Sequence, residues 1–169
     1  VLFFEDGMYR MYFGDFKNFG HVHRASSTDG RNFRYDGECL PAALMVNDVK
    51  KFRPGGRPCY LMGLHRNRNK LWYALSDDGM KFEPQRELAS SLGAADRYIV
   101  AVGWVTQGER LLGFVYGAGA VPGLNRNRLF ARWLQKTVVV TDAEGRRHVP
   151  TAAIGPDRCL LSLGEGKQL

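Results

Sequence analysis

Cysteine is scarce in this sequence. The 169 residues contain three, Cys39, Cys59 and Cys159, and no two of them form a CxxC pair. An odd number of widely spaced cysteines argues against a disulfide framework and against a zinc site built on thiolates. We therefore expect free, mostly buried thiols and no structural metal.

Long apolar runs are also missing. The longest, residues 98–105, is far shorter than the roughly 20 residues that a membrane-spanning helix needs. No positively charged stretch followed by an apolar run opens the chain, so no secretion signal is visible. We expect a soluble protein with no membrane partner, and its compartment stays open. Because a strand-like run is already under way at Val1, we expect a fragment of a longer protein.

Motifs that bind nucleotides or activate a serine are absent. The chain has no Gly-x-x-x-x-Gly-Lys loop and no Gly-x-Ser-x-Gly elbow, and the glycine-rich residues 117–120 lack a third glycine at dinucleotide-binding spacing. We expect no cofactor. A net charge of +7 is the one feature that favours nucleic acid, and no nucleic-acid-binding module accompanies it. We therefore expect no nucleic-acid partner.

An internal repeat is the strongest positive feature. Residues 29–33 read Asp-Gly-Arg-Asn-Phe, and residues 78–82, 49 positions later, read Asp-Gly-Met-Lys-Phe. Ala25 and Ser27 match Ala74 and Ser76 at the same offset, so Ala-x-Ser-x-Asp-Gly-x-x-Phe occurs twice. A period near fifty residues suits a four-stranded sheet used as a repeating unit. The sequence therefore predicts consecutive blades of a β-propeller.

The predicted fold class is all-β. Residues 1–141 form a partial β-propeller, with two clear four-stranded blades at about residues 1–47 and 48–95 and a degenerate third at 96–141. Residues 142–169 form a β tail, either the start of a second β unit or closing strands. In the third blade Arg128, Arg132 and Lys136 suit one face of a helix or of a strand, and the β-branched residues 137–141 favour a strand. The Ser and Asp residues of the repeated motif are predicted to brace turns rather than to form a site. They are Ser27, Asp29, Ser76 and Asp78.

Two aspartates are the candidate catalytic residues. Asp48 and Asp96 immediately precede the segments predicted as the first strands of the second and third units, 48 residues apart. First strands line the central channel of a propeller, so these carboxylates are expected at one mouth of the channel. Glycoside cleavage needs two carboxyl groups across the scissile bond. The alternative is that each aspartate caps a turn before a strand.

Candidate binding residues lie in the segments that follow the second strands. His21, His23, His65 and Arg66 occupy these segments in the first two units, and Arg126 does so in the third. They could donate hydrogen bonds to sugar hydroxyls, and Trp104 could stack on a ring. The alternative is solvated loops and a core aromatic. A zinc site on His21 and His23 would need ligands that the neighbouring sequence does not offer.

The repeated motifs carry a family resemblance. Tyr-x-Met-Tyr at residues 9–12, followed by the Asp-Gly motif, resembles the five-bladed propellers of the β-fructosidase and arabinanase/xylosidase superfamily. Residues 47–52 are similar to the Arg-Asp-Pro-x-Val-Phe segment there, whose aspartate stabilises the transition state or tunes the acid. Asn47 and Val49 replace its arginine and proline. The resemblance covers residues 1–82 well and the third unit loosely.

The resemblance implies a function and its alternative. It implies a glycosidase acting on an oligosaccharide or glycoside. The superfamily's acid motif, Glu-Cys, is spelled by Glu38-Cys39 but stands before Asp48, whereas the family order places it after, so we interpret it as coincidence. Because no other glutamate opens a first strand, a non-catalytic propeller that binds a glycan or a protein partner is the alternative. The oligomeric state stays open.

Overall fold

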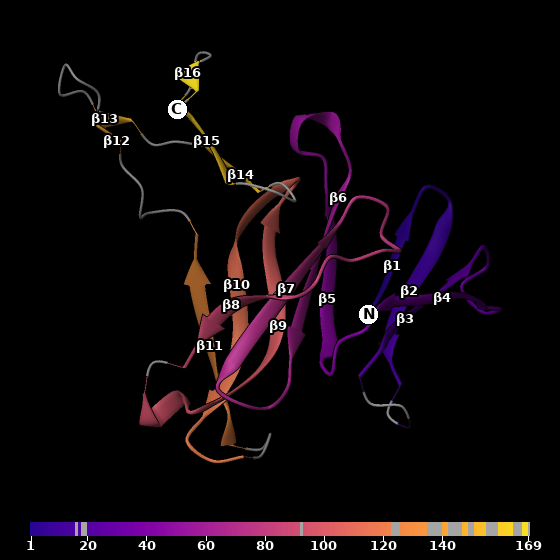
Figure 1. Cartoon of the computed structure of the whole chain (residues 1–169), viewed down its shortest axis with the longest axis horizontal. Helices are drawn as coiled ribbons and strands as arrows, with labels where there is room; N and C mark the ends of the chain where they lie inside the picture. The colour runs from indigo at the N-terminus through magenta and orange to yellow at the C-terminus, as the bar shows by residue number, and fades with distance from the viewer. Residues whose placement is uncertain are drawn as a thin grey trace.

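The computed structural model describes residues 1–15, 17, 20–91, 93–122 and 126–134 in full, and five later strands by their backbone. The chain is all-β and antiparallel, as predicted. Its first sheet has the order β1-β2-β3-β4, its second β5-β6-β7-β8 and its third β11-β10-β9. Figure 1 shows these sheets following one another from right to left in chain order. Within the described residues, no helix is long and apolar enough to cross a bilayer.

The strand bounds are as follows. The first sheet holds β1 (Leu2–Glu5), β2 (Met8–Gly14), β3 (Val22–Ser27) and β4 (Arg34–Leu40). The second holds β5 (Met45–Phe52), β6 (Cys59–His65), β7 (Lys70–Ser76) and β8 (Arg86–Ser90). The third holds β9 (Tyr98–Gln107), β10 (Arg110–Gly119) and β11 (Arg128–Trp133). Short 3-10 turns η1 (Pro54–Gly56) and η2 (Ala94–Asp96) precede β6 and β9.

The third unit and the tail are also built of strands. Arg128 and Arg132 lie on β11, which confirms the strand alternative for that segment, whereas Lys136 and residues 137–139 lie outside the described residues. The later strands are β12 (Val140–Thr141), β13 (Arg147–His148), β14 (Thr151–Ile154), β15 (Cys159–Leu163) and β16 (Lys167–Gln168). β12 pairs with β13, and β15 lies between β14 and β16. Cys39 and Cys59 are free and buried, as predicted, and the side chain of Cys159 lies outside the described residues.

The sequence repeat is a structural repeat. In the first sheet Tyr9 is paired with Ser27, and in the second Tyr60 is paired with Ser76. The turns that follow are braced alike. The Ser27 hydroxyl donates to Asp29 and accepts from the Gly30 N–H, and Ser76 does the same with Asp78 and Gly79. The prediction that these residues brace turns is confirmed.

Both turn aspartates also accept hydrogen bonds from the backbone. The N–H groups of Asn32 and Arg31, with the Ser27 hydroxyl, hold the pKa of Asp29 well below its usual range. For Asp78, burial acts to raise the pKa, but bonds from Lys81, Met80 and Ser76 outweigh it and leave the pKa lowered. A carboxylate that accepts several N–H bonds stays ionised, so both braces are fully formed at neutral pH.

The hydrophobic core lies between the sheets in two clusters, one on each face of the second sheet, and β6 contributes side chains to both. Every residue of β6 is buried. Tyr60, Met62 and Leu64 pack toward the first sheet, whereas Cys59 and Leu61 pack toward the third. A strand alternates its side chains between two faces, so a strand that is buried throughout implies a sheet covered on both sides. The contacts of β5 with both β2 and β9 agree with this. The second sheet is therefore sandwiched between the other two.

Candidate functional site

A cleft of about 220 Å³ opens where the first two sheets meet. Its polar lining includes Asp15, His21, Asn47 and His65, and Phe13 adds a large apolar side chain. These residues come from the end of β2, the β2–β3 loop, the start of β5 and the end of β6. Antiparallel pairing puts the start of a first strand beside the end of a second strand. The expectation that residues after the second strands share one end of the sheets with the start of β5 agrees with this arrangement.

The part of the cleft that comes from the first sheet is accessible to solvent. His21 is half-exposed, and its Nδ1 lies 2.8 Å from Glu38 Oε2. The His21 ring stacks on that of His23, 6.2 Å between centroids, and His23 Nδ1 lies 2.9 Å from the Tyr35 hydroxyl. Asp15 Oδ1 accepts the N–H of Lys17 at 2.8 Å. These imidazoles and this carboxylate can exchange hydrogen bonds with a ligand because water already reaches them.

Asn47 positions the side of the cleft that the second sheet forms. A register shift between Val46 and Asp48 makes Asn47 the extra residue of a β-bulge. Its Oδ1 lies 2.7 Å from His65 Nδ1 and accepts the N–H of Val102 on β9 at 3.2 Å. Because that oxygen is an acceptor, His65 carries its proton on Nδ1 and presents Nε2 as an acceptor. Burial lowers the pKa of His65, so the ring is neutral at neutral pH.

The sequence predicted that Asp48 precedes its strand, but Asp48 lies inside the strand. β5 begins at Met45, and Asp48 is its fourth residue. Asp48 Oδ2 accepts the N–H of Trp104 on β9 at 2.9 Å, and Oδ1 lies 3.1 Å from Lys50 Nζ. Together with Asn47, this side chain satisfies two amides of β9 and ties the second sheet to the third. The strand starts early because Met45 and Val46 pair with His65 and Leu64 ahead of the bulge.

Asp96 does precede its strand, two residues before Tyr98, but it closes a turn. It is 6 % exposed, and its Oδ1 accepts the N–H of Gly93 at 2.8 Å. This is the turn-capping role that the sequence left as the alternative. Asp48 accepts from Trp104 and Asp96 accepts from Gly93, and neither aspartate lines the cleft.

The remaining candidates divide between surface and core. Arg66 and Arg126 are exposed next to the ends of β6 and β11. Trp104 is 7 % exposed and packs edge-on against Phe114 in the core, so it is not available to stack on a sugar ring. It is buried because the third sheet packs this face against β6 of the second sheet, where a Cβ at Gly63 would lie 3.3 Å from the Trp104 ring, a contact that a lone tryptophan in the sequence does not reveal.

Two residues of the cleft were missed. Asp15 directly follows the second strand of the first unit, which is the position that singled out the histidines, so the same argument could have found it. Asn47 was noticed only as a replacement for an arginine. Its role depends on the β-bulge, and no feature of the sequence predicted this bulge.

The role of Asp48 can be tested by comparing two substitutions. Asp48→Ala leaves the Trp104 N–H without an acceptor, and an unsatisfied buried donor costs about 1–3 kcal/mol of unfolding free energy. Asp48→Asn keeps an oxygen there, so we expect a loss of less than about 1 kcal/mol. Urea unfolding of both variants measures the difference. Equal stability of the two would contradict a bond from Trp104 to Asp48.

Comparison with known proteins adds no family: no protein-family model and no curated protein matches the chain. The resemblance to the propeller glycosidases rests on its motifs alone. Among the described residues, no group of three or more His, Cys, Asp or Glu side chains could hold a metal ion.

Proposed function

We propose that this chain is part of a β-propeller that binds a saccharide in the cleft between its first two sheets. The propeller part of the proposal is supported by the stacking of the sheets. The first two sheets repeat one register, the three sheets follow one another in chain order, and the middle one is buried on both faces. The first strands of the second and third sheets, β5 and β9, contact each other.

The composition of the cleft carries the saccharide part. Ligand sites combine apolar surface with a few fixed polar groups. Here Phe13 and Met45 supply apolar surface, and the Asp15 carboxylate, the His21 ring and the bulge-fixed Asn47 and His65 supply donors and acceptors. A sugar offers both hydroxyl groups and apolar C–H faces. The volume of about 220 Å³ holds part of a sugar chain and leaves the remainder to the surrounding surface.

Hydrolysis of a glycosidic bond is the second candidate, and Asp15 favours it. This is the carboxylate that lines the cleft, and glycosidases act through a pair of them. Asp48 follows the cleft residue Asn47 and is 16 % exposed at its side chain, so it stays the candidate partner. Asp96 is less suitable because its carboxylate is buried in the turn at Gly93.

Isothermal titration of the chain with xylo-, arabino- and fructo-oligosaccharides tests the binding proposal. We expect binding to one of these series, weakened about tenfold by Asp15→Asn or His21→Ala, since each removes a charge-assisted or neutral hydrogen bond. Glu109→Gln is the matched control for Asp15→Asn: it removes the same charge from the exposed β9–β10 turn and should change the affinity by less than about twofold. No binding of any series up to about 10 mM would overturn the proposal.

The same mixtures, analysed for released sugars, test hydrolysis. If the cleft is catalytic, Asp15→Asn lowers turnover by about a hundredfold or more, because a lost acid–base or electrostatic group has an effect of that size. Asp48→Asn should lower it similarly while the protein stays folded. Binding without product in the parent chain would leave the binding function and remove the catalytic one.

A further inference from the structure

An arginine-rich surface lies beside the cleft, at the same end of the sheets. The tripeptide Arg-Asn-Arg occurs at residues 66–68 and again at 126–128. The first copy directly follows His65, the last residue of β6 and a cleft residue. The second copy leads into β11, which begins at Arg128. Arg97 precedes β9 at this end as well.

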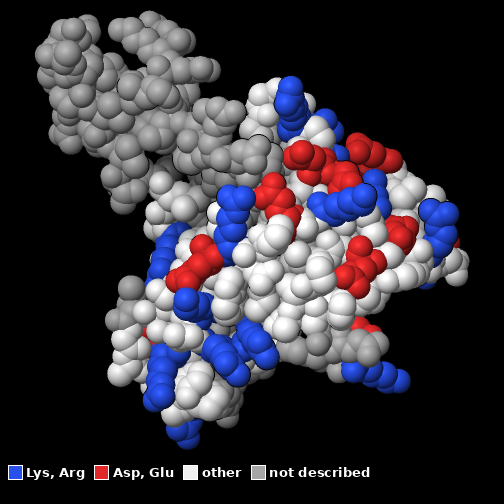
Figure 2. Space-filling view, viewed as in Figure 1, with Lys and Arg blue, Asp and Glu red and all other residues white. Residues whose placement is uncertain are grey.

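The backbone brings these segments together. The Ile99 N–H donates to the Arg68 carbonyl at 2.7 Å, which joins the first tripeptide to the start of β9. Tyr98 is paired with Gly119 at the end of β10. A Cβ at Gly119 would lie 3.4 Å from the Arg126 carbonyl oxygen. Arg68, Arg97 and Arg126 therefore belong to one end of the second and third sheets, and Figure 2 shows Lys and Arg side chains gathering at the lower left end of the molecule.

Four of these arginines have no acidic partner among the residues that the structure describes. Arg68, Arg97, Arg126 and Arg128 are exposed, and none of them forms an ion pair with any described residue. Residues 64–70 and 126–134 contain no Asp or Glu. The neighbouring Lys70 differs, since its Nζ lies 2.5 Å from Glu87. Asp96, beside Arg97, turns its carboxylate inward to Gly93.

We propose that the saccharide bound by this protein is acidic, with its carboxylate, sulfate or phosphate groups held by the Arg-Asn-Arg surface (residues 66–68, 97 and 126–128). This rests on the proposed saccharide binding. A guanidinium pairs with a planar carboxylate or a phosphate through two parallel N–H bonds, which a neutral hydroxyl cannot match. Asn67 stands between Arg66 and Arg68 and is exposed, so its amide is suited to sugar hydroxyls.

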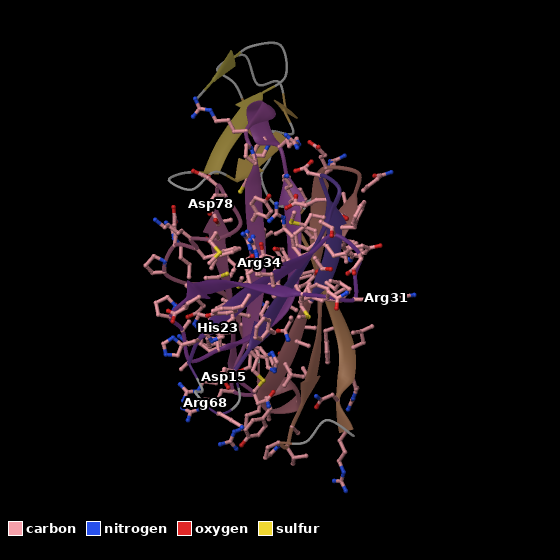
Figure 3. All side chains as sticks on the ribbon, turned by 90° about the vertical axis from the view of Figure 1, so that its right-hand side faces the viewer. Asp15, His23, Arg31, Arg34, Arg68 and Asp78 are labelled. Carbon is pink, nitrogen blue, oxygen red and sulfur yellow. The ribbon has the colours of Figure 1, made fainter. Side chains whose placement is uncertain are left out.

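The cleft and the arginine surface divide the ligand between them. The Asp15 carboxylate lines the cleft, so hydroxyl groups of the saccharide can donate hydrogen bonds there. Because Arg66 directly follows His65, a chain leaving the cleft passes onto the arginine surface. In Figure 3 the labelled Asp15 and Arg68 lie toward the same lower end, whereas Arg31 and Arg34 lie farther up.

Two probes of equal length and different charge test the inference. Titration of the chain with oligogalacturonate and with the same oligomer fully methyl-esterified isolates the contribution of the carboxylates. We expect the acid to bind at least about tenfold more tightly at low salt, and added NaCl to reduce this preference because exposed charges are screened. Equal affinity for acid and ester would overturn the inference but leave saccharide binding intact. Binding of neither oligomer, nor of the neutral series above, would overturn both proposals.

A matched pair of variants locates the effect. Arg68→Gln/Arg126→Gln should weaken binding of the acid about tenfold or more and leave the ester unchanged, since charge-assisted bonds are lost. Arg31→Gln/Arg34→Gln removes the same two charges from exposed positions elsewhere and should weaken it less than about twofold. Equal losses in the two variants would show a general effect of net charge and contradict a defined site. Tighter binding of a single-stranded oligonucleotide than of oligogalacturonate would also overturn the assignment.

Discussion

Glu5→Ala is expected to lower the free energy of unfolding by about 3 kcal/mol, because it removes the carboxylate shared by a cluster of partly buried charges. Glu5 Oε1 lies 2.6 Å from Arg10 Nε and accepts the Tyr60 hydroxyl at 2.8 Å. Glu5 Oε2 lies 2.6 Å from Lys51 Nζ. The Glu5 side chain is 9 % exposed, and removing it takes the carboxylate away from Arg10 and leaves the exposed Asp6 as the acidic partner of Lys51. Urea unfolding measures the loss.

Two companion variants separate the charge from the packing. Glu5→Gln keeps the shape and an acceptor for Tyr60, so its loss should be smaller, about 1–2 kcal/mol. Lys51→Met added to Glu5→Ala removes one stranded cation and should restore part of the stability. The cluster joins the β1–β2 hairpin to β5 and β6, so it fastens the first sheet to the second. A Glu5→Ala variant as stable as the parent would show that these charges do not hold the sheets together.

Gly79→Ala is expected to cost about 3 kcal/mol, more than the same change at Gly7. Both glycines have positive φ, +68° at Gly79 and +74° at Gly7, where an L side chain is strained by about 1–2 kcal/mol. A Cβ at Gly79 would also lie 2.9 Å from the Tyr12 hydroxyl and 2.9 Å from the Tyr60 ring, whereas a Cβ at Gly7 meets nothing within 4 Å. The excess at Gly79 measures the contact between its turn and the first sheet.

The contact that this substitution disturbs joins the first sheet to the turn after β7 of the second sheet. The Tyr12 hydroxyl donates to the Gly79 carbonyl at 2.6 Å, and Arg24 Nη1 donates to the same oxygen at 3.0 Å. Thermal unfolding followed by near-ultraviolet circular dichroism measures the loss of aromatic packing, to which Tyr12 and Tyr60 contribute. A Gly79→Ala loss no larger than that of Gly7→Ala would mean that the turn does not pack as described.

The repeat was readable from the sequence because it is written in local chemistry. A Ser-x-Asp-Gly turn forms from hydrogen bonds within four residues. The motifs at Ser27 and Ser76 therefore predict the same turn independently of the rest of the fold. Because the third strand of each sheet ends at this turn, the turn also located the residues of the third strands. The ends of β5 did not follow, because its bulge at Asn47 reflects partners on β6 and β9.

The candidate site shows the same division. Residue order was enough to place His21, His65 and the start of β5 at one end of the sheets, because antiparallel strands alternate in direction. It could not assign Asp48, whose carboxylate accepts the amide N–H of Trp104 56 positions later, nor show that Trp104 is buried against β6. Local turns and strand alternation depend on neighbours along the chain. The acceptor of an edge amide, the burial of a ring and the convergence of three arginine segments depend on neighbours in space, and folding alone brings these together.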